Sequence, residues 1–230
     1  MAKAYRHIFF DLDETLWDFQ SNSRRVLHVM LERHGLQEAG IPVQQFVERY
    51  HHHNERYWSL YRQGRISQHT LRLGRWQHTL RDFGLDENAA PALSEEYLDL
   101  LPAQTGLMAH AREVLHYLQG RYALHILTNG FDAVQRRKLE ASELQPFFHQ
   151  VITAEQAGSR KPDPAIFHYA FSLTGARADD SLLVGDSWEA DALGAQAVGM
   201  DYVLIAPSGA ASLPANARVI FGLKELIHRL

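Results

Sequence analysis

The chain has 230 residues, of which 46% are hydrophobic, and its net charge is -4 at pH 7. This length can hold one large domain or a domain with an insertion, and the apolar share is enough for a full core, which excludes a disordered chain. The acidic balance provides no basic field for nucleic acid, and the lack of cysteine excludes disulfides, thiolate metal sites and cysteine nucleophiles.

The N-terminal segment predicts a soluble protein. Met1–Arg6 leads directly into the first apolar run, without the longer apolar stretch of a signal peptide. No uninterrupted apolar run reaches the roughly 18 residues that a membrane span needs. We therefore expect a cytoplasmic protein that does not bind membranes.

The first element is a short buried strand that begins near His7, and a long helical region follows it. No strand signal occurs between about Asp18 and Leu101, and four amphipathic helices are expected there. Such a segment is longer than an ordinary connection between a strand and a helix, so it predicts an inserted helical domain. The expected helices are Phe19–Leu31, Pro42–Tyr61, Ser67–Phe83 and Ala89–Leu101.

Strands and helices alternate after Thr105, which is typical of right-handed crossovers and a parallel sheet. We predict a doubly wound, Rossmann-like α/β core made of residues 1–17 and 102–230, with a helical cap domain at 18–101. The expected strands are Tyr122–Leu127, His149–Thr153, Ser181–Val184, Asp201–Ile205 and a short one at Arg218–Phe221. The expected helices are Leu107–Leu118, Phe131–Leu139, Pro164–Leu173, Ala190–Ala197 and Gly222–Leu230, and Ala206–Ala217 is a predicted loop.

Two aspartates, Asp11 and Asp13, stand at the end of the first strand. If the extended geometry persists, both side chains point the same way. Two adjacent carboxylates are costly unless a cation neutralises them or one of them holds a proton. Both conditions suit a metal-assisted transfer enzyme, with Asp11 as nucleophile, Asp13 as proton donor and a divalent cation between Asp11 and the substrate.

Polar residues also follow three later strands, and each has an ordinary alternative explanation. Thr128 and Asn129 form either a phosphate cradle or a plain turn with a capping residue. Lys161 precedes proline, which restricts its backbone to extended conformations. It is either part of the site or an ordinary lysine in a surface loop. Asp186 is either a metal ligand or a helix N-cap, with Asp191 about one helical turn further.

Taken together, these residues favour the functional interpretation, since parallel sheets bind ligands at the carboxyl ends of their strands. Asp11 and Asp186 suit Mg²⁺, which prefers oxygen ligands. Thr128 and Lys161 can bind the oxygens of a transferring group, and Asp191 can fix Lys161 or a metal-bound water. The ligand that these groups suit is a phosphoryl group, because phosphoryl transfer depends mainly on positioning and charge stabilisation. The leading hypothesis is the hydrolysis of a small-molecule phosphomonoester.

At this point the sequence resembles the haloacid dehalogenase (HAD) superfamily. The motifs are Asp11-Leu12-Asp13-Glu14-Thr15, Thr128-Asn129, Lys161-Pro162 and Gly185-Asp186-Ser187 with Asp191. The resemblance implies that Asp11 becomes an aspartyl-phosphate and that Asp13 acts first as acid, then as base. It implies that Mg²⁺ binds Asp11, the backbone carbonyl of Asp13 and Asp186, while Thr128, the Asn129 backbone and Lys161 hold the phosphate. It also implies that the helical insert is the family's first type of cap.

Longer stretches resemble the pyrimidine 5'-nucleotidase branch of this superfamily. They are Phe9–Leu16, with Glu14 where many members have glycine, Tyr61–Ser67, and Ile126–Phe131 running on to Arg137–Glu140. Sugar and sugar-acid phosphatases and phosphomutases of the superfamily remain alternatives, whereas true dehalogenases lack the second aspartate of the first motif. A non-enzymatic regulator is disfavoured because Asp11, Asp13, Lys161 and Asp186 are all present.

The substrate is expected to be selected by the cap, whose aromatic residues and arginines suit a base and a second anionic group. Packing among the four cap helices accounts for most of these aromatic residues. Trp17 and Phe19 border the junction of core and cap and are the residues of this group expected to contact the substrate. Thr15 of the first motif is also expected to bind the substrate. The triplet His51-His52-His53 is interpreted as a solvated helix face, because consecutive helical residues point in different directions.

Overall fold

The computed structural model describes residues 5–206 and 213–230. By its internal contacts the chain divides into two compact units, one made of residues up to Phe19 with Thr105–Leu230, and one made of Gln20–Gln104. The predicted limits of the helical domain, 18 and 101, stay predictions. Met1–Ala4 and residues 207–212 of the predicted loop lie outside the described residues.

The first unit contains a six-stranded sheet in the order β3-β2-β1-β4-β5-β6, in which every neighbouring pair is parallel. This confirms the doubly wound α/β fold, with the first strand in the centre. The strands are β1 (His7–Phe10), β2 (Ala123–Thr128), β3 (Gln150–Thr153), β4 (Ser181–Gly185), β5 (Asp201–Ile205) and β6 (Val219–Ile220).

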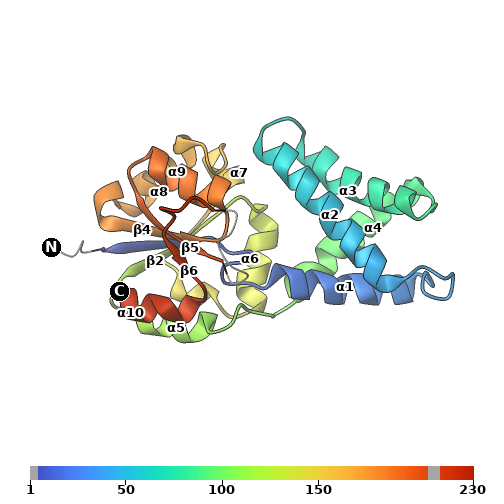
Figure 1. Ribbon diagram of the computed structural model, residues 1–230, viewed down its shortest axis with the longest axis horizontal. Helices are drawn as coiled ribbons and strands as arrows, with labels where there is room; N and C mark the ends of the chain where they lie inside the picture. Colours follow the sequence, from blue (N-terminus) through green and yellow to red (C-terminus); the bar gives the residue numbers. More distant parts are fainter. Residues whose placement is uncertain (1–4, 207–212) are drawn as a thin grey trace. The chain divides into compact units, whose positions relative to one another are not determined.

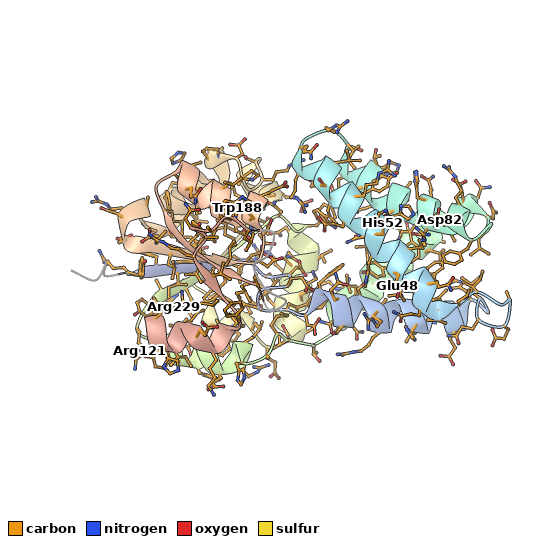
Figure 2. All side chains as sticks on the ribbon, viewed as in Figure 1. Glu48, His52, Asp82, Arg121, Trp188 and Arg229 are labelled. Carbon is orange, nitrogen blue, oxygen red and sulfur yellow. The ribbon has the colours of Figure 1, made fainter. Side chains whose placement is uncertain are left out.

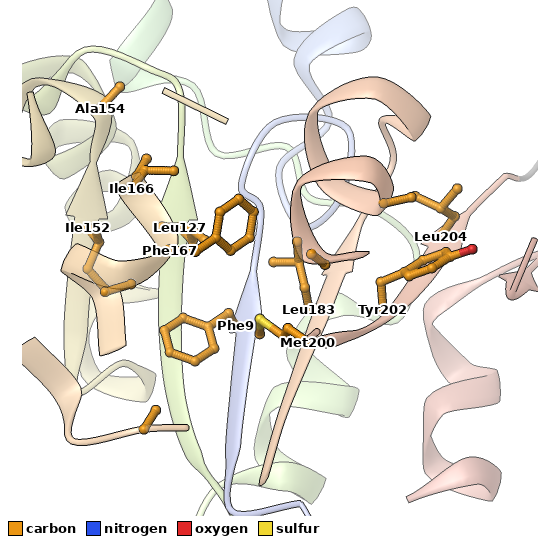
Figure 3. Packing of buried hydrophobic residues seen from close by; sticks show 14 residues of the cluster. Phe9, Leu127, Ile152, Ala154, Ile166, Phe167, Leu183, Met200, Tyr202 and Leu204 are labelled. Atoms are coloured by element: carbon orange, nitrogen blue, oxygen red, sulfur yellow. The ribbon is translucent and has the colours of Figure 1, made fainter. Parts of the chain in front are cut away.

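Helices cover both faces of this sheet, with α8 and α9 on one face and α5 and α10 on the other (Figure 1). Phe9 and Leu183 of the sheet pack with Phe167 of α8 in one buried cluster (Figure 3). Because both faces are covered, the strands are mainly apolar, and most of their polar residues stand at the strand ends. The helices of this unit are α5 (Ala111–Leu118), α6 (Asp132–Ala141), α7 (Ala154–Ala157), α8 (Pro164–Thr174), α9 (Leu193–Ala197) and α10 (Leu226–Arg229).

Three of the predicted helices begin differently from the expectation, and the one predicted from Gly222 is a 3-10 turn at Leu223–Glu225 followed by α10. The helix predicted from Leu107 starts at Ala111, because Leu107 forms a bridge with Trp17 and the Met108 amide donates to the Leu16 carbonyl at 2.9 Å. These backbone groups are thus used by the loop after β1 and are not available to a helix. The helix predicted from Ala190 starts with a π-helical turn at 188–192, which continues into α9.

The second unit is entirely helical in its described elements, as predicted. Its aromatic core brings the rings of Tyr50 and Trp76 to 4.6 Å and those of Tyr50 and Tyr97 to 5.2 Å, so these aromatic residues pack the helices together. Although α2 has 20 residues, neither it nor any other described helix is long and apolar enough to cross a membrane, and the cytoplasmic location stays a prediction. The helices are α1 (Phe19–Arg33), α2 (Val43–Arg62), α3 (Gln68–Asp82) and α4 (Ala90–Leu100).

The interpretation of the histidine triplet as a solvated face is wrong for two of its members. His53 is buried and its Nε2 lies 2.8 Å from an oxygen of Asp82, while His51 is half-buried and lies 2.8 Å from the Ser23 hydroxyl. His52 alone of the three is exposed, beside an open groove of about 590 Å³ that Glu48 and Asp82 also line (Figure 2). His53 lies on the buried face of α2, three residues after Tyr50 and four before Tyr57, and this spacing was the signal in the sequence.

Candidate active site

The strand register brings the predicted residues to one edge of the sheet. Phe10 pairs with both Ile126 of β2 and Val184 of β4, and the Asp11 amide donates to the Val184 carbonyl at 2.9 Å. Asp11 and Asp186 directly follow β1 and β4, and Thr128 is the last residue of β2, so all three lie at the carboxyl edge, where parallel sheets bind ligands.

Lys161 lies at the centre of this edge and is buried. Its Nζ donates to Asp11 Oδ1 and to Asp191 Oδ1, both at 2.7 Å. Burial by itself disfavours the charged ammonium group, but the two carboxylates outweigh that effect and raise the pKa of Lys161. Lys161 is thus a buried cation held by two acids, and the surface-loop alternative is wrong.

Asp11 itself is buried, and burial raises its pKa to about 7, an effect that Asp191 strengthens and Lys161 opposes. The hydrogen bond from Lys161 uses Oδ1, and among the described residues no donor reaches Oδ2. A carboxylate with one fixed and one available oxygen has the geometry of an oriented nucleophile.

The ligand atoms of Asp11, Asp186 and Asp191 all lie within 4.8 Å of one another. Surrounding protein atoms partly desolvate the Asp186 carboxyl group and raise its pKa well above the usual value, and the nearby Asp11 and Asp191 raise it further. The Asp186 side chain is nevertheless exposed on one side. Lys161 supplies the single cation bonded to this cluster among the described residues, so negative charge exceeds positive charge there. Oxygen ligands and excess negative charge fit a hard divalent cation.

Asp191 is the most enclosed member of the cluster. Besides accepting from Lys161, its Oδ2 accepts from the Ser187 amide at 3.0 Å. It packs so tightly on Gly185 that a Cβ atom at that glycine would stand 2.3 Å from Asp191 Oδ2. Of the two roles foreseen for Asp191, the structure shows the contact with Lys161.

Asn129 holds the backbone of Lys161 with its side chain. Its Oδ1 accepts from the Lys161 amide at 2.8 Å, and its Nδ2 donates to the Lys161 carbonyl at 2.9 Å. The resemblance implies a phosphate contact through the Asn129 backbone, and that contact stays a prediction. The side chain shows why an amide suits this position, since it offers one donor and one acceptor.

We expect Asn129→Ala to lower the free energy of unfolding by about 1–3 kcal/mol, because the amide and carbonyl of Lys161 would lose their partner near a buried ammonium group. Urea unfolding monitored by circular dichroism measures the change. Asn88→Ala serves as the matched control, since Asn88 is exposed, and it should shift stability by less than about 0.5 kcal/mol. Equal stabilities for the two variants would contradict the role of Asn129.

Sequence reasoning missed two residues of α6 that bind Asp13. Lys138 Nζ donates to Asp13 Oδ1 at 2.5 Å, and Gln135 Nε2 donates to Asp13 Oδ2 at 2.9 Å and to Thr128 Oγ1 at 2.8 Å. Both side chains are buried. Their spacing of three residues, which places both on one helix face, was the available signal.

The remaining residues of the first motif are enclosed. Thr15 is fully buried and its hydroxyl lacks a hydrogen-bond partner among the described residues, and Trp17 is fully buried with the Lys138 ammonium 4.5 Å from its ring centroid. Their predicted contacts with substrate stay predictions. Glu14 has φ 58, in the left-handed region that favours glycine, which agrees with its place at a position where many family members have glycine.

Comparisons with known proteins show the family to which the chain belongs. A family model described as haloacid dehalogenase-like hydrolase matches residues 5–199. The chain belongs to the haloacid dehalogenase-like hydrolase family. The structure of YfnB from Bacillus subtilis, a HAD-hydrolase whose crystals contain magnesium, matches with a TM-score of 0.87 at 28% identity and covers 98% of both chains.

Two curated relatives indicate the kind of hydrolase. Pyrimidine 5'-nucleotidase PynA of Streptococcus pneumoniae is 30% identical over 88% of this chain and 84% of its own length. Human N-acylneuraminate-9-phosphatase is 27% identical over 85% of this chain and 79% of its own length. The expectation of an enzyme with phosphatase activity is confirmed.

Proposed function

We propose that this HAD-family enzyme hydrolyses nucleoside 5'-monophosphates through an aspartyl-phosphate on Asp11, with Mg²⁺ as cofactor. The observation that carries the proposal is the buried Asp11–Lys161–Asp191 group beside Asp186 at the carboxyl edge of the sheet. Asp13 stands two residues further along, held by a cation of its own. These are the groups that phosphoryl transfer needs: a nucleophile, a proton donor and fixed positive charge.

In the first step, Asp11 attacks phosphorus, the bond from phosphorus to the ester oxygen breaks, and Asp13 gives that oxygen its proton. In the second step, Asp13 takes a proton from water, the water oxygen attacks phosphorus, and the acyl-phosphate bond breaks. Phosphate is then released, and the Asp11 carboxylate is restored. Lys161, Thr128 and the Asn129 backbone bind the phosphoryl oxygens in both steps.

Asp11, Asp186 and the backbone carbonyl of Asp13 would hold Mg²⁺. When bound, the ion neutralises negative charge on the phosphoryl oxygens and on the cluster of carboxylates. The fit rests on the carboxylates that lie within 4.8 Å of one another and on their excess of negative charge over Lys161. The negative charge of Asp13 does not add to this excess, because the Lys138 ammonium group forms an ion pair with it.

Nucleotides are the substrate class favoured by the relatives, since both PynA and YjjG of Escherichia coli, at 30% identity, are named pyrimidine 5'-nucleotidases. A sugar-acid phosphatase is the second candidate, favoured by the resemblance to N-acylneuraminate-9-phosphatase. The helical unit, which we propose acts as a cap, would decide between a base and a sugar acid through its side chains.

The test is release of phosphate from a panel of phosphomonoesters with Mg²⁺ or with excess EDTA. We expect UMP, dUMP and dTMP to be hydrolysed faster than sugar phosphates, and EDTA to lower every rate by about 100-fold or more, since a bound metal ion contributes several kcal/mol of charge stabilisation. Added Mg²⁺ should restore the rates. Full activity in EDTA would contradict the metal requirement, and a preference for sugar-acid phosphates would favour the second candidate.

A further inference from the structure

The carboxylate of Asp13 is held on both of its oxygens by one face of α6. Lys138 binds Oδ1 and Gln135 binds Oδ2, and the Gln135 amide also reaches the Thr128 hydroxyl. The Asp13 side chain keeps about 30% of its surface exposed, whereas that of Lys138 keeps 4%. The acid can therefore face a substrate while its two partners stay enclosed.

The partners have little freedom to move. The Lys138 ammonium lies 4.5 Å from the Trp17 ring centroid and 5.9 Å from that of Phe19, distances at which a cation is attracted to an aromatic ring. The Gln135 side chain packs over Gly130, where a Cβ atom would stand 2.4 Å from its amide. Both donors are thus fixed by packing, and the rotamer of Asp13 is fixed by them.

We propose that Lys138, with Gln135, is a positioning residue that aims Asp13 at the leaving oxygen. This inference rests on the proposed function, in which Asp13 is the proton donor. A general acid must lie within hydrogen-bond reach of the oxygen that it protonates, and the two donors hold the Asp13 carboxyl group in one orientation. The contribution arises in the transition state of ester cleavage.

This role makes a prediction about leaving groups. An alkyl ester such as a nucleoside monophosphate releases a strongly basic alkoxide, so its cleavage needs proton donation. The p-nitrophenolate ion leaves readily without a proton. Loss of Lys138 should therefore lower kcat/KM for the nucleoside monophosphate far more than for p-nitrophenyl phosphate. A defect in folding or in phosphate binding would lower kcat/KM for both substrates alike.

The experiment compares wild type with Lys138→Met, which keeps the chain length and removes the charge. We expect kcat/KM to fall about 100-fold for UMP and less than about 10-fold for p-nitrophenyl phosphate, in line with the usual contribution of general acid catalysis. Across aryl phosphates of graded leaving-group basicity, the variant should show a steeper dependence of kcat/KM than wild type. Gln135→Met removes the other hydrogen-bond partner of Asp13. It should also make kcat/KM depend more steeply on leaving-group basicity, but by less than Lys138→Met.

Arg136→Met is the matched control, since Arg136 lies on α6 but pairs at the surface with Asp132. This variant should leave the dependence of kcat/KM on leaving-group basicity unchanged. If Lys138→Met does not fold, Gln135→Met alone decides. Equal losses for UMP and p-nitrophenyl phosphate in the folded variants, with wild type active, would overturn the positioning role. A wild-type protein inactive on every phosphomonoester would instead overturn the proposed function.

Discussion

Asp11→Asn is expected to lower kcat for phosphomonoesters by about 10⁴-fold or more, because loss of a covalent nucleophile removes the chemical pathway itself. The fold should persist. Asparagine has nearly the same shape as aspartate, and its side-chain oxygen can still accept the hydrogen bond from Lys161. Lys161 would still have Asp191 as a partner at 2.7 Å.

Phosphate release and thermal unfolding of the same protein preparation measure both halves of this prediction. Acid-quenched wild type, taken during turnover, should carry phosphate on Asp11, and the variant should carry none. Asp179→Asn is a matched control, since Asp179 is exposed and pairs only with Arg177 among the described residues. A variant at Asp11 with ordinary turnover would show that another group attacks phosphorus.

Lys161→Met is expected to reduce both stability and activity. Removing the buried ammonium leaves Asp11 and Asp191 without their shared cation, and breaking a buried ion pair typically costs about 3–5 kcal/mol. Because Lys161 is also proposed to bind the phosphoryl oxygens, kcat should fall by about 10²–10³-fold. Urea unfolding and phosphate release measure the two losses.

The effect of Mg²⁺ on thermal stability tests whether Lys161 is the counterion of the carboxylate cluster. Without Lys161 the carboxylates near Asp186 attract a dication more strongly, so added Mg²⁺ should raise the melting temperature of Lys161→Met more than that of wild type. Lys224→Met, at an exposed lysine paired with Glu113, should change neither stability nor its response to Mg²⁺. A Lys161→Met variant as stable as wild type would show that Lys161 is not the counterion of this cluster.

Much of the fold could be predicted from the sequence because the signals are local. Every strand of the sheet was expected at its place in the chain, since each is a short apolar run bounded by turn residues and the runs alternate with helical patterns. The helix start at Ala111 could not be predicted, since Leu107 and Met108 are taken up by pairing with the distant loop at Leu16 and Trp17. The partner of His53 could not be predicted either, since Asp82 lies on another helix.

The order of the motifs was enough to place Asp11, Thr128, Lys161 and Asp186 near one another, because parallel strands end at a common edge. Only the tertiary structure decided which partner each of them has. That Asn129 clamps the Lys161 backbone, and that Lys138 and Gln135 hold Asp13, depends on side-chain directions between elements far apart in the chain. Periodicity and strand ends are encoded locally, whereas such pairings arise only when packing brings the elements together.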